Sequence, residues 1–362
     1  MDDIKFNKYR QAGDIANVTL EKAKSLCHDK LKASYICNFC DSLMIQLLNN
    51  KYKKDVKGIT LPTCLSINNI VSHYSYDESN DYEVKEGDII KIELACHIDN
   101  NVASIGDTIK VGDPTFNESD LMIAANKALE IGIKNIQLDQ DIYLFSDILQ
   151  KVAKCFNLKV VKRQNKDESM VYDWIFRDTE RFNEPSWIIK KEHELVLEDD
   201  ELDSEEIYIN EMFSRGEAYH MSLAFCRCDT IKNSDSDGVL FQKSFKRHNL
   251  KSKYARELMS KIEKDYDKEF FKLDKIDMSD TRKKFGLKEC LEKDVLRSLG
   301  IMEGSSEEIV YLKCTIIIQN NTVYKLTGSK CKFQSSELLS DELNNIITSS
   351  SKFDKKEFKK IE

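Results

Sequence analysis

The chain has 362 residues, of which 41% are hydrophobic and 33% are charged, and its formal net charge is -8. This length and composition predict a soluble globular protein. No apolar run approaches the roughly 20 residues that span a bilayer, and the first ten residues lack the apolar stretch of a secretion signal. We therefore expect an intracellular protein with no membrane partner, and reduced thiols for its 11 cysteines.

The first 50 residues are predicted to form two amphipathic helices. Apolar side chains recur at intervals of three and four residues over 14–26 and again over 36–47. The second helix contains Cys37 and Cys40, a spacing that zinc sites and redox sites also use. No second cysteine pair follows at finger spacing and no strand precedes this one, so we interpret both as buried structural thiols.

A β-hairpin over residues 87–111 is the strongest local prediction. Apolar side chains alternate along its first limb, a second limb follows, and the Asp-Asn-Asn sequence at 99–101 tolerates positive φ. One acid on each limb of such a hairpin commonly builds a site for divalent ions. Glu93 lies on the first limb, but Ser104, where the partner acid would be wanted, is neutral and cannot balance cation charge. We interpret the hairpin as a metal site that has lost an acid.

Further helices and strands are predicted on both sides of this hairpin. A β-prone stretch at 58–77 contains His73, and a lone histidine is usually a hydrogen-bonded core or surface residue. We expect helices from Asn117 or Ser119 through Ile131 and from Ser146 onward, and strands at 207–213, 309–318 and 322–326. The order of elements suggests a two-fold internal repeat.

Charge is unevenly distributed in the second half of the chain. Residues 192–206 contain nine acids and no base, which we interpret as a solvated loop. Residues 243–264 contain eight Lys or Arg against two Glu, with Tyr254 and His248 among them. Such a run is typical of a nucleic-acid surface, although an ordinary charged helical face is the alternative. The candidate binding residues are Lys243, Lys246, Arg247, Lys251, Lys253, Arg256, Lys261 and Lys264.

The sequence resembles the methionine aminopeptidases and their pita-bread relatives. LPTCLSINNIVSHYS at 61–75 resembles the Pro-Thr, Asn-Asn and His-Tyr pattern of the type-two enzymes, and KIELACHIDNNVAS at 91–104 resembles their first metal-binding hairpin. The segments KYRQAGDIAN, GDIIKIELACHID, KKFGLKECLEKDVL and YLKCTIIIQNN are closer to a non-peptidase branch, the proliferation-associated and ErbB-receptor-binding proteins. The resemblance runs in collinear order over about residues 6–335.

This resemblance implies an α+β fold. It implies a single pita-bread domain over 1–362, with a pseudo-two-fold repeat of helices and antiparallel strands. A basic, mainly helical insertion is implied at about 240–300. We also expect a mobile tail from about residue 350, where bases outnumber acids.

The resemblance also identifies where metal ligands would lie. The family enzymes hold two metal ions with two Asp, one His and two Glu. In chain order these ligand positions correspond to Glu93, Ser104, Asp167, Glu211 and Lys313. His73 corresponds to a substrate-side histidine that non-peptidase relatives also keep.

Lys313 argues most strongly against bound metal. At about 4 Å and an effective dielectric near 20, its ammonium would repel a divalent ion by roughly 8 kcal/mol. No Cys and His at a recognisable spacing offer a replacement nucleophile. We therefore expect a pseudoenzyme with no cofactor and no small-molecule substrate. The alternatives are a diverged metal-dependent methionine aminopeptidase, using one metal or other ligands such as Glu168 or His193, and an adaptor that recognises a peptide in the old cleft.

The non-peptidase branch implies a partner and a location. Its members associate with the large ribosomal subunit near the nascent-chain exit tunnel, where ribosomal RNA and ribosomal proteins are the expected contacts, and related proteins escort pre-ribosomes. The resemblance therefore implies a role in translation regulation or ribosome biogenesis, with the insertion meeting ribosomal RNA. We expect a cytoplasmic protein, with the nucleus and nucleolus as further locations. The short tail and the acidic total charge depart from the branch.

Overall fold

The computed structural model describes most of the chain. The described residues are 1–140, 144–161, 163–164, 170–171, 175–178, 212–228, 231–234, 238–244, 248–266, 269–320, 322–329, 334, 336–349 and 356–357. Every helix within these ranges is too short or too polar to cross a membrane.

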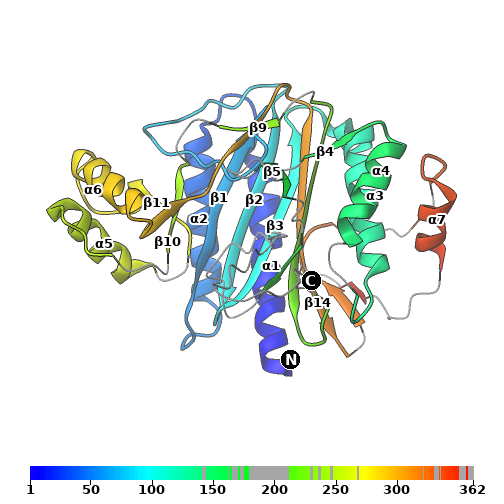
Figure 1. Cartoon of the computed structure of the whole chain (residues 1–362), viewed down its shortest axis with the longest axis horizontal. Coiled ribbons are helices and arrows are strands. Elements are labelled where there is room, and N and C mark those ends of the chain that lie inside the picture. Colours follow the sequence, from blue (N-terminus) through cyan, green and yellow to red (C-terminus); the bar gives the residue numbers. More distant parts are fainter. Residues whose placement is uncertain are drawn as a thin grey trace, which may run out of the picture.

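A large antiparallel sheet runs through the centre of the molecule (Figure 1). Its main path is β1-β2-β3-β14-β15-β16, with bounds Lys57–Ile67, Ile89–Ile98, Asn101–Lys110, Ile309–Gln319, Thr322–Lys325 and Lys356–Glu357. β8 (Ala218–Cys226) pairs with β14 and also with β4 (Lys159–Val160) and β7 (Ile175–Asp178). Only the β15–β16 pairing is parallel among the described strands of this sheet. The predicted strands at 309–318 and 322–326 are confirmed to within one residue.

The predicted hairpin is confirmed as β2 and β3. The two strands pair continuously from Ile89 opposite Lys110 to Ile98 opposite Asn101. Asp99 and Asn100 form the turn with φ of 54° and 58°, the left-handed conformation that short polar residues tolerate.

Helices α1 (Asp3–Leu26) and α2 (Ala33–Asn49) pack against one face of β1–β3. α1 begins eleven residues before the predicted helix because Asp2 caps it, its side chain accepting a hydrogen bond from the Lys5 amide at 2.6 Å. Cys37 and Cys40 are free, buried thiols within α2. Burial raises the pKa of Cys40 to about 12, so its reactive thiolate form is disfavoured.

The second half repeats this arrangement around β8 and β14. α3 (Asp120–Asn135) and α4 (Leu144–Cys155) pack against these strands in the largest hydrophobic cluster. Ser119 caps α3, as predicted, by accepting a hydrogen bond from the Met122 amide at 3.4 Å. The expected two-fold repeat of helices and strands is therefore visible. Outside residues 240–300, the other described elements are η1 (Pro114–Glu118), β5 (Arg163–Gln164), β6 (Met170–Val171), β9 (Ile231–Asn233), β13 (Met302–Gly304) and α7 (Asp341–Thr348).

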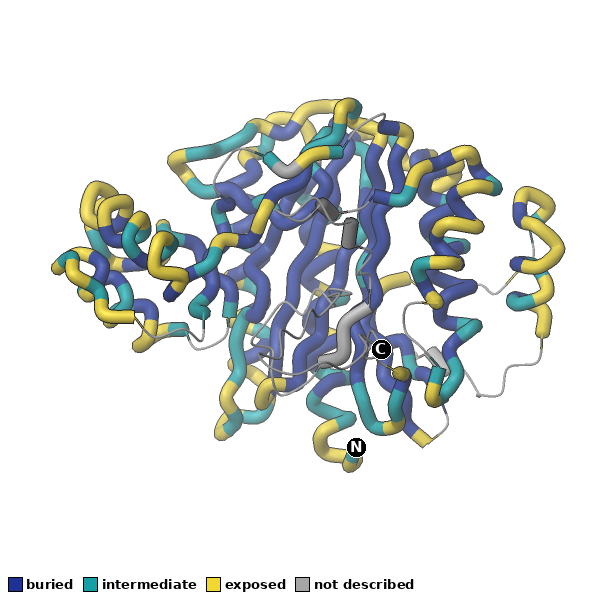
Figure 2. The backbone as a smooth tube through the Cα atoms, viewed as in Figure 1, coloured by how far each residue is buried: buried dark blue, intermediate teal, exposed yellow. Residues whose placement is uncertain are grey.

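Residues 240–300, called the insertion segment below, project from one side of the sheet (Figure 1). The segment contains β10 (Leu240–Lys243), α5 (Lys253–Asp265), β11 (Phe271–Lys272), η2 (Leu273–Lys275), α6 (Asp280–Glu292) and β12 (Leu296–Ser298). The three strands form a small sheet that the sequence did not predict, and α5 and α6 complete a core of their own. The outer faces of both helices are exposed (Figure 2).

A buried ion pair anchors the insertion segment to the central sheet. The Lys272 Nζ lies 3.8 Å from the Asp41 Oδ2 of α2, while the Asp41 Oδ1 accepts a hydrogen bond from the Thr63 amide at 2.8 Å. Burial alone would lower the pKa of Lys272, but the Asp41 carboxylate raises it above its usual value. Next to this pair the Phe270 amide donates to the Thr60 carbonyl at 2.9 Å. The segment is therefore held in a fixed position.

Candidate functional site

One face of the central sheet carries buried polar side chains. Along β2, Ile90, Ile92 and Leu94 pack against α1 and α2, so Lys91 and Glu93 point to the opposite face. Along β8 the alternation is the same, with apolar residues packed toward α3 and α4 and His220 and Ser222 on the other face. Both halves of the repeat therefore contribute polar groups to one site. Its polar members are half-buried Lys313 and the buried residues His73, Glu93, Ser104, His220, Ser222 and Thr315.

Glu93 is the negative centre of this site. It is 1% exposed, its Oε1 accepts a hydrogen bond from the His73 amide at 2.6 Å, and its Oε2 lies 3.7 Å from the Lys313 Nζ and 3.6 Å from the His73 Nε2. Burial would raise the pKa of Glu93, but the charges of His73 and Lys313 and the hydrogen bond from the His73 amide lower it below its usual value. Glu93 therefore stays ionised.

The backbone of His73 is held in an unusual conformation to make this contact. Its φ is 65°, which is uncommon for histidine and marks a locally strained backbone. The ring Nδ1 lies 2.8 Å from the Ser72 Oγ, which fixes the orientation of the imidazole. The histidine that the resemblance identified as substrate-side thus lies beside Glu93 and helps to bind its carboxylate.

Gly106 makes room for the Glu93–Lys313 pair. It lies opposite Glu93 in the β2–β3 register and opposite Lys313 in the β3–β14 register. A Cβ at this position would come within 3.0 Å of both the Lys313 Cβ and the Tyr311 Cε1. Because glycine has no side chain, Lys313 can extend across β3 and reach Glu93.

Tyr311 also borders Glu93. Its pKa is raised well above the usual value, first by burial and then by the Glu93 charge, although a hydrogen bond with Ser222 opposes the change. Tyr311 therefore remains neutral beside Glu93. With His73 and Lys313, it surrounds the carboxylate with groups that favour its ionised form.

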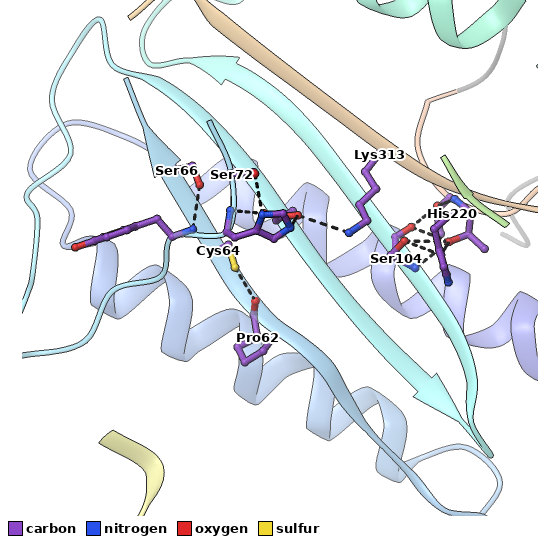
Figure 3. A network of polar contacts seen from close by, with 12 residues as sticks. Pro62, Cys64, Ser66, Ser72, Ser104, His220 and Lys313 are labelled. Carbon is purple, nitrogen blue, oxygen red and sulfur yellow. Dashed lines mark hydrogen bonds and ion pairs between the residues drawn. The ribbon is translucent and has the colours of Figure 1, made fainter. Parts of the chain in front are cut away.

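A second cluster of this site contains Ser104 and His220 (Figure 3). The His220 Nδ1 lies 2.8 Å from the Ser104 Oγ and 3.0 Å from the Thr315 Oγ1. Figure 3 shows Lys313 between this cluster and the residues around Ser72. Ser104 thus lies in the site, and the side chains that its hydroxyl contacts, His220 and Thr315, are neutral.

A serine hydroxyl beside a histidine could serve as a nucleophile and its general base. The pKa of His220 does not suit this role. Burial, together with the positive charge of Lys313, lowers the pKa of His220 to about 3. A general base must accept the proton of the hydroxyl, and the imidazolium that forms is disfavoured here. The pair is therefore poorly suited to nucleophilic catalysis.

The described donors of the site do not fit the two metal ions that the resemblance implies for the family enzymes. Within the described ranges, no three His, Cys, Asp or Glu side chains are grouped so that they could hold a metal ion. Among the described residues of the site, Glu93 supplies the one carboxylate. The Lys313 ammonium already lies 3.7 Å from it. Divalent ions bind oxygen-rich, anionic sets, and a cation at this position opposes their binding.

The remaining ligand positions lie outside the described residues. This applies to Asp167 and Glu211, to the alternatives Glu168 and His193, and to the predicted strand at 207–213 before residue 212. The residue that the β8–β14 register places opposite Lys313 is Ser222, which the sequence analysis did not single out. The alternation of polar and apolar residues over 218–226 is the sequence pattern that could have identified Ser222.

The candidate RNA-binding residues are only partly a free surface. Lys251, Lys253, Arg256 and Lys264 are exposed, Lys243 and Lys261 are half-buried, and Lys246 and Arg247 lie outside the described residues. The Arg256 guanidinium donates at 2.9 Å to the carbonyls of Leu250 and Lys251, so it stabilises the start of α5. Exposed Lys284 and Lys288 of α6 add positive charge that the eight candidates did not include.

Comparisons with known proteins agree with this geometry. Residues 7–165 match the model of metallopeptidase family M24. Proliferation-associated protein A of Dictyostelium discoideum is 28% identical over 371 residues, covering 98% of this chain and 91% of that protein. ErbB-3 binding protein 1 of Solanum tuberosum is 25% identical over 332 residues, covering 89% of this chain and 80% of that protein.

A solved structure has the same fold. The structure of a thermophilic Arx1 matches with a TM-score of 0.74 at 20% identity, covering 97% of this chain and 99% of that one. The expected α+β pita-bread fold is thus confirmed. Over most of its length the chain is similar in sequence to ErbB-3-binding and proliferation-associated proteins, and its first half is similar to metallopeptidase family M24.

Proposed function

We propose that this protein is a non-catalytic member of the aminopeptidase-like proteins that binds the large ribosomal subunit through ribosomal RNA. The observation that supports the loss of catalysis is the Lys313 ammonium 3.7 Å from Glu93 Oε2. A lysine occupies the charge role that metal ions have in the enzymes. Without metal, no water is activated at this site, and His220 is poorly suited to replace it as a base.

The ribosome as a partner is supported by the resemblance to the non-peptidase branch and by the charge of the insertion segment. Residues 243–264 carry eight bases and two acids, although the whole chain has a net charge of -8. At physiological salt the Debye length is about 8 Å, so distant acids are largely screened from a phosphate at this surface. Exposed Lys253 and Lys264 lie on one side of α5, away from its buried residues.

The location and biological role follow from this proposal. A protein that binds mature large subunits acts in the cytoplasm, in translation regulation. A protein that escorts their precursors also passes through the nucleus and nucleolus, in ribosome biogenesis. Imaging of the tagged protein distinguishes these two roles, because only the second requires a nucleolar pool.

Sedimentation of the full chain with purified large subunits tests the proposed partner. If the contact neutralises about four phosphates, the logarithm of the binding constant falls against the logarithm of salt concentration with a slope of roughly -3 to -4. A chain that does not sediment with large subunits even at low salt would contradict the proposal. Binding that does not depend on salt concentration would indicate that the chain contacts a ribosomal protein and not RNA.

A further inference from the structure

Two aromatic side chains are exposed side by side on the insertion segment. Phe285 of α6 is 62% exposed and Tyr254 of α5 is 39% exposed. Their ring centroids are 6.4 Å apart, with an angle of 33° between the ring planes. Large aromatic rings are usually at least half-buried, so Phe285, with Tyr254 beside it, marks a candidate interaction surface.

The packing of α5 against α6 builds this pair. Gly286 faces α5, and a Cβ there would lie 2.7 Å from the Tyr254 carbonyl oxygen, so only glycine permits the two helices to approach this closely. Lys283, Gly286 and Cys290 form the buried side of α6, which directs Phe285 outward. The close approach of the two helix backbones thus sets the spacing of the two rings.

Positive charge surrounds the two rings. The Arg282 guanidinium carbon lies 6.0 Å from the centroid of the Tyr254 ring, a cation–π distance. Lys253, Lys284 and Lys288 are exposed on the same two helices. Of the nearby acids, Glu257 lies 4.0 Å from Arg282, and the two Glu289 oxygens accept hydrogen bonds from the Lys251 and Ser252 amides.

We propose that Phe285 and Tyr254 form a stacking platform for unpaired bases of RNA, with Arg282, Lys284 and Lys288 positioned to meet the adjoining phosphates. Exposed rings within a cationic surface match the two parts of a nucleotide, a flat base and an anionic phosphate. A base within a perfect duplex exposes no face to such rings, so the ligand is a loop, bulge or single strand. This inference rests on the proposed RNA binding and states which RNA the insertion segment selects.

Binding of the purified full chain to two fluorescent RNAs tests the platform. One RNA is a hairpin with 2-aminopurine in its loop, and the other is a fully paired duplex of the same length and charge. We expect tighter binding of the loop RNA and quenching of its fluorescence as the base stacks. Phe285→Ala and Tyr254→Ala should each weaken loop binding by roughly 5- to 100-fold and reduce the quenching, while leaving the duplex affinity unchanged. Phe285→Trp should retain both.

Tyr35→Ala is the matched control. Tyr35 is 51% exposed on α2, and its ring centroid lies 6.1 Å from that of half-buried Phe39, a ring pair outside the insertion segment. This variant should bind both RNAs as the native chain does.

The outcomes separate the platform from the proposed function. Unchanged loop affinity and quenching in Phe285→Ala, with RNA binding still lost on charge reversal of the insertion segment, would overturn the platform alone. If Phe285→Ala weakens binding to large subunits but not to loop RNA, the rings contact a ribosomal protein, which also overturns the platform. A native chain that binds neither RNA nor large subunits would overturn the proposed function itself.

Discussion

The Lys313 Nζ lies 3.7 Å from the Glu93 Oε2, and the sequence resemblance matched both positions to metal ligands of the aminopeptidases. The lysine side chain is 12% exposed and the glutamate side chain 1% exposed, so both charges are largely removed from water. Such a pair has a high desolvation cost, and removal of one partner leaves the other charge uncompensated.

Replacement of Lys313 by Met is expected to destabilise the protein by roughly 3 kcal/mol at pH 7, because Glu93 is left charged and buried. The loss should shrink near pH 4, where the carboxyl of the variant binds a proton. Urea unfolding at both pH values measures this. The double variant Lys313→Met with Glu93→Gln is the control and should recover part of the stability. Equal losses at the two pH values would contradict the account.

Gly106 should tolerate no side chain. In Gly106→Val the new Cβ would lie 3.0 Å from the Lys313 Cβ and the Tyr311 Cε1, so these neighbours must move to make room for it. We expect a loss of about 1–3 kcal/mol, as is typical of overpacked cores. Thermal unfolding measures it, with Gly106→Ala as the smaller step. A native melting temperature for Gly106→Val would show that the register around Lys313 is wrong.

From the sequence, Glu93, Ser104 and Lys313 were placed at one site, but Gly106, Ser222 and His220 beside them were not identified. The three positions were found because the resemblance is collinear along the chain. Gly106 and Ser222 contact Lys313 only through strand pairings between distant segments, and short motifs do not reveal which residues a register brings together. His220 was missed for the same reason, because its partners Ser104 and Thr315 come from two other strands.

The small sheet of the insertion segment was also missed, for a different reason. Its strands are two to four residues long, too short to show an alternating pattern. The hairpin and the helix after Ser119 were predicted well, since they carry strong turn and capping signals, whereas the central strand β8 was not predicted. Boundaries failed where a cap lay outside the apolar pattern, as Asp2 does at the start of α1.

Lys91 should make stability depend on pH. It is fully buried on β2, and its Nζ donates to the Asn68 carbonyl. Burial lowers its pKa from 10.5 to about 7. Between these values the unfolded chain binds a proton that the folded chain does not, so this group makes stability rise with pH, by up to about 1.4 kcal/mol per pH unit.

Lys91→Met tests this effect, measured as the free energy of unfolding between pH 7 and 8.5. Above that range buried thiols add an opposite trend, since burial raises their pKa values and the unfolded chain ionises first. We expect the variant to show a smaller rise with pH than the native chain. Lys53→Met, at an exposed lysine, is the control and should keep the native slope. A native slope in Lys91→Met would mean that Lys91 is charged in the folded protein.

The chain should release no methionine from a Met-Ala-Ser peptide in the presence of cobalt, manganese, iron or zinc ions. The expectation follows from Lys313, which opposes divalent ions at the site. Elemental measurement should find less than about a tenth of an equivalent of these metals in the purified protein. Metal-dependent release that a chelator abolishes, or one tightly bound ion per chain that is lost in Glu93→Ala, would restore the aminopeptidase alternative.

Two charge-reversed variants of the full chain test the central claim most directly, by their sedimentation with large ribosomal subunits. The first replaces Lys253, Lys264, Lys284 and Lys288, exposed on α5 and α6, with Glu. The control makes the same change in net charge at exposed Lys5, Lys30, Lys53 and Lys54. Surface changes of this kind rarely cost much stability, which thermal unfolding verifies. The account predicts that the first variant loses large-subunit binding while the control keeps it. Equal binding by the two variants would contradict it.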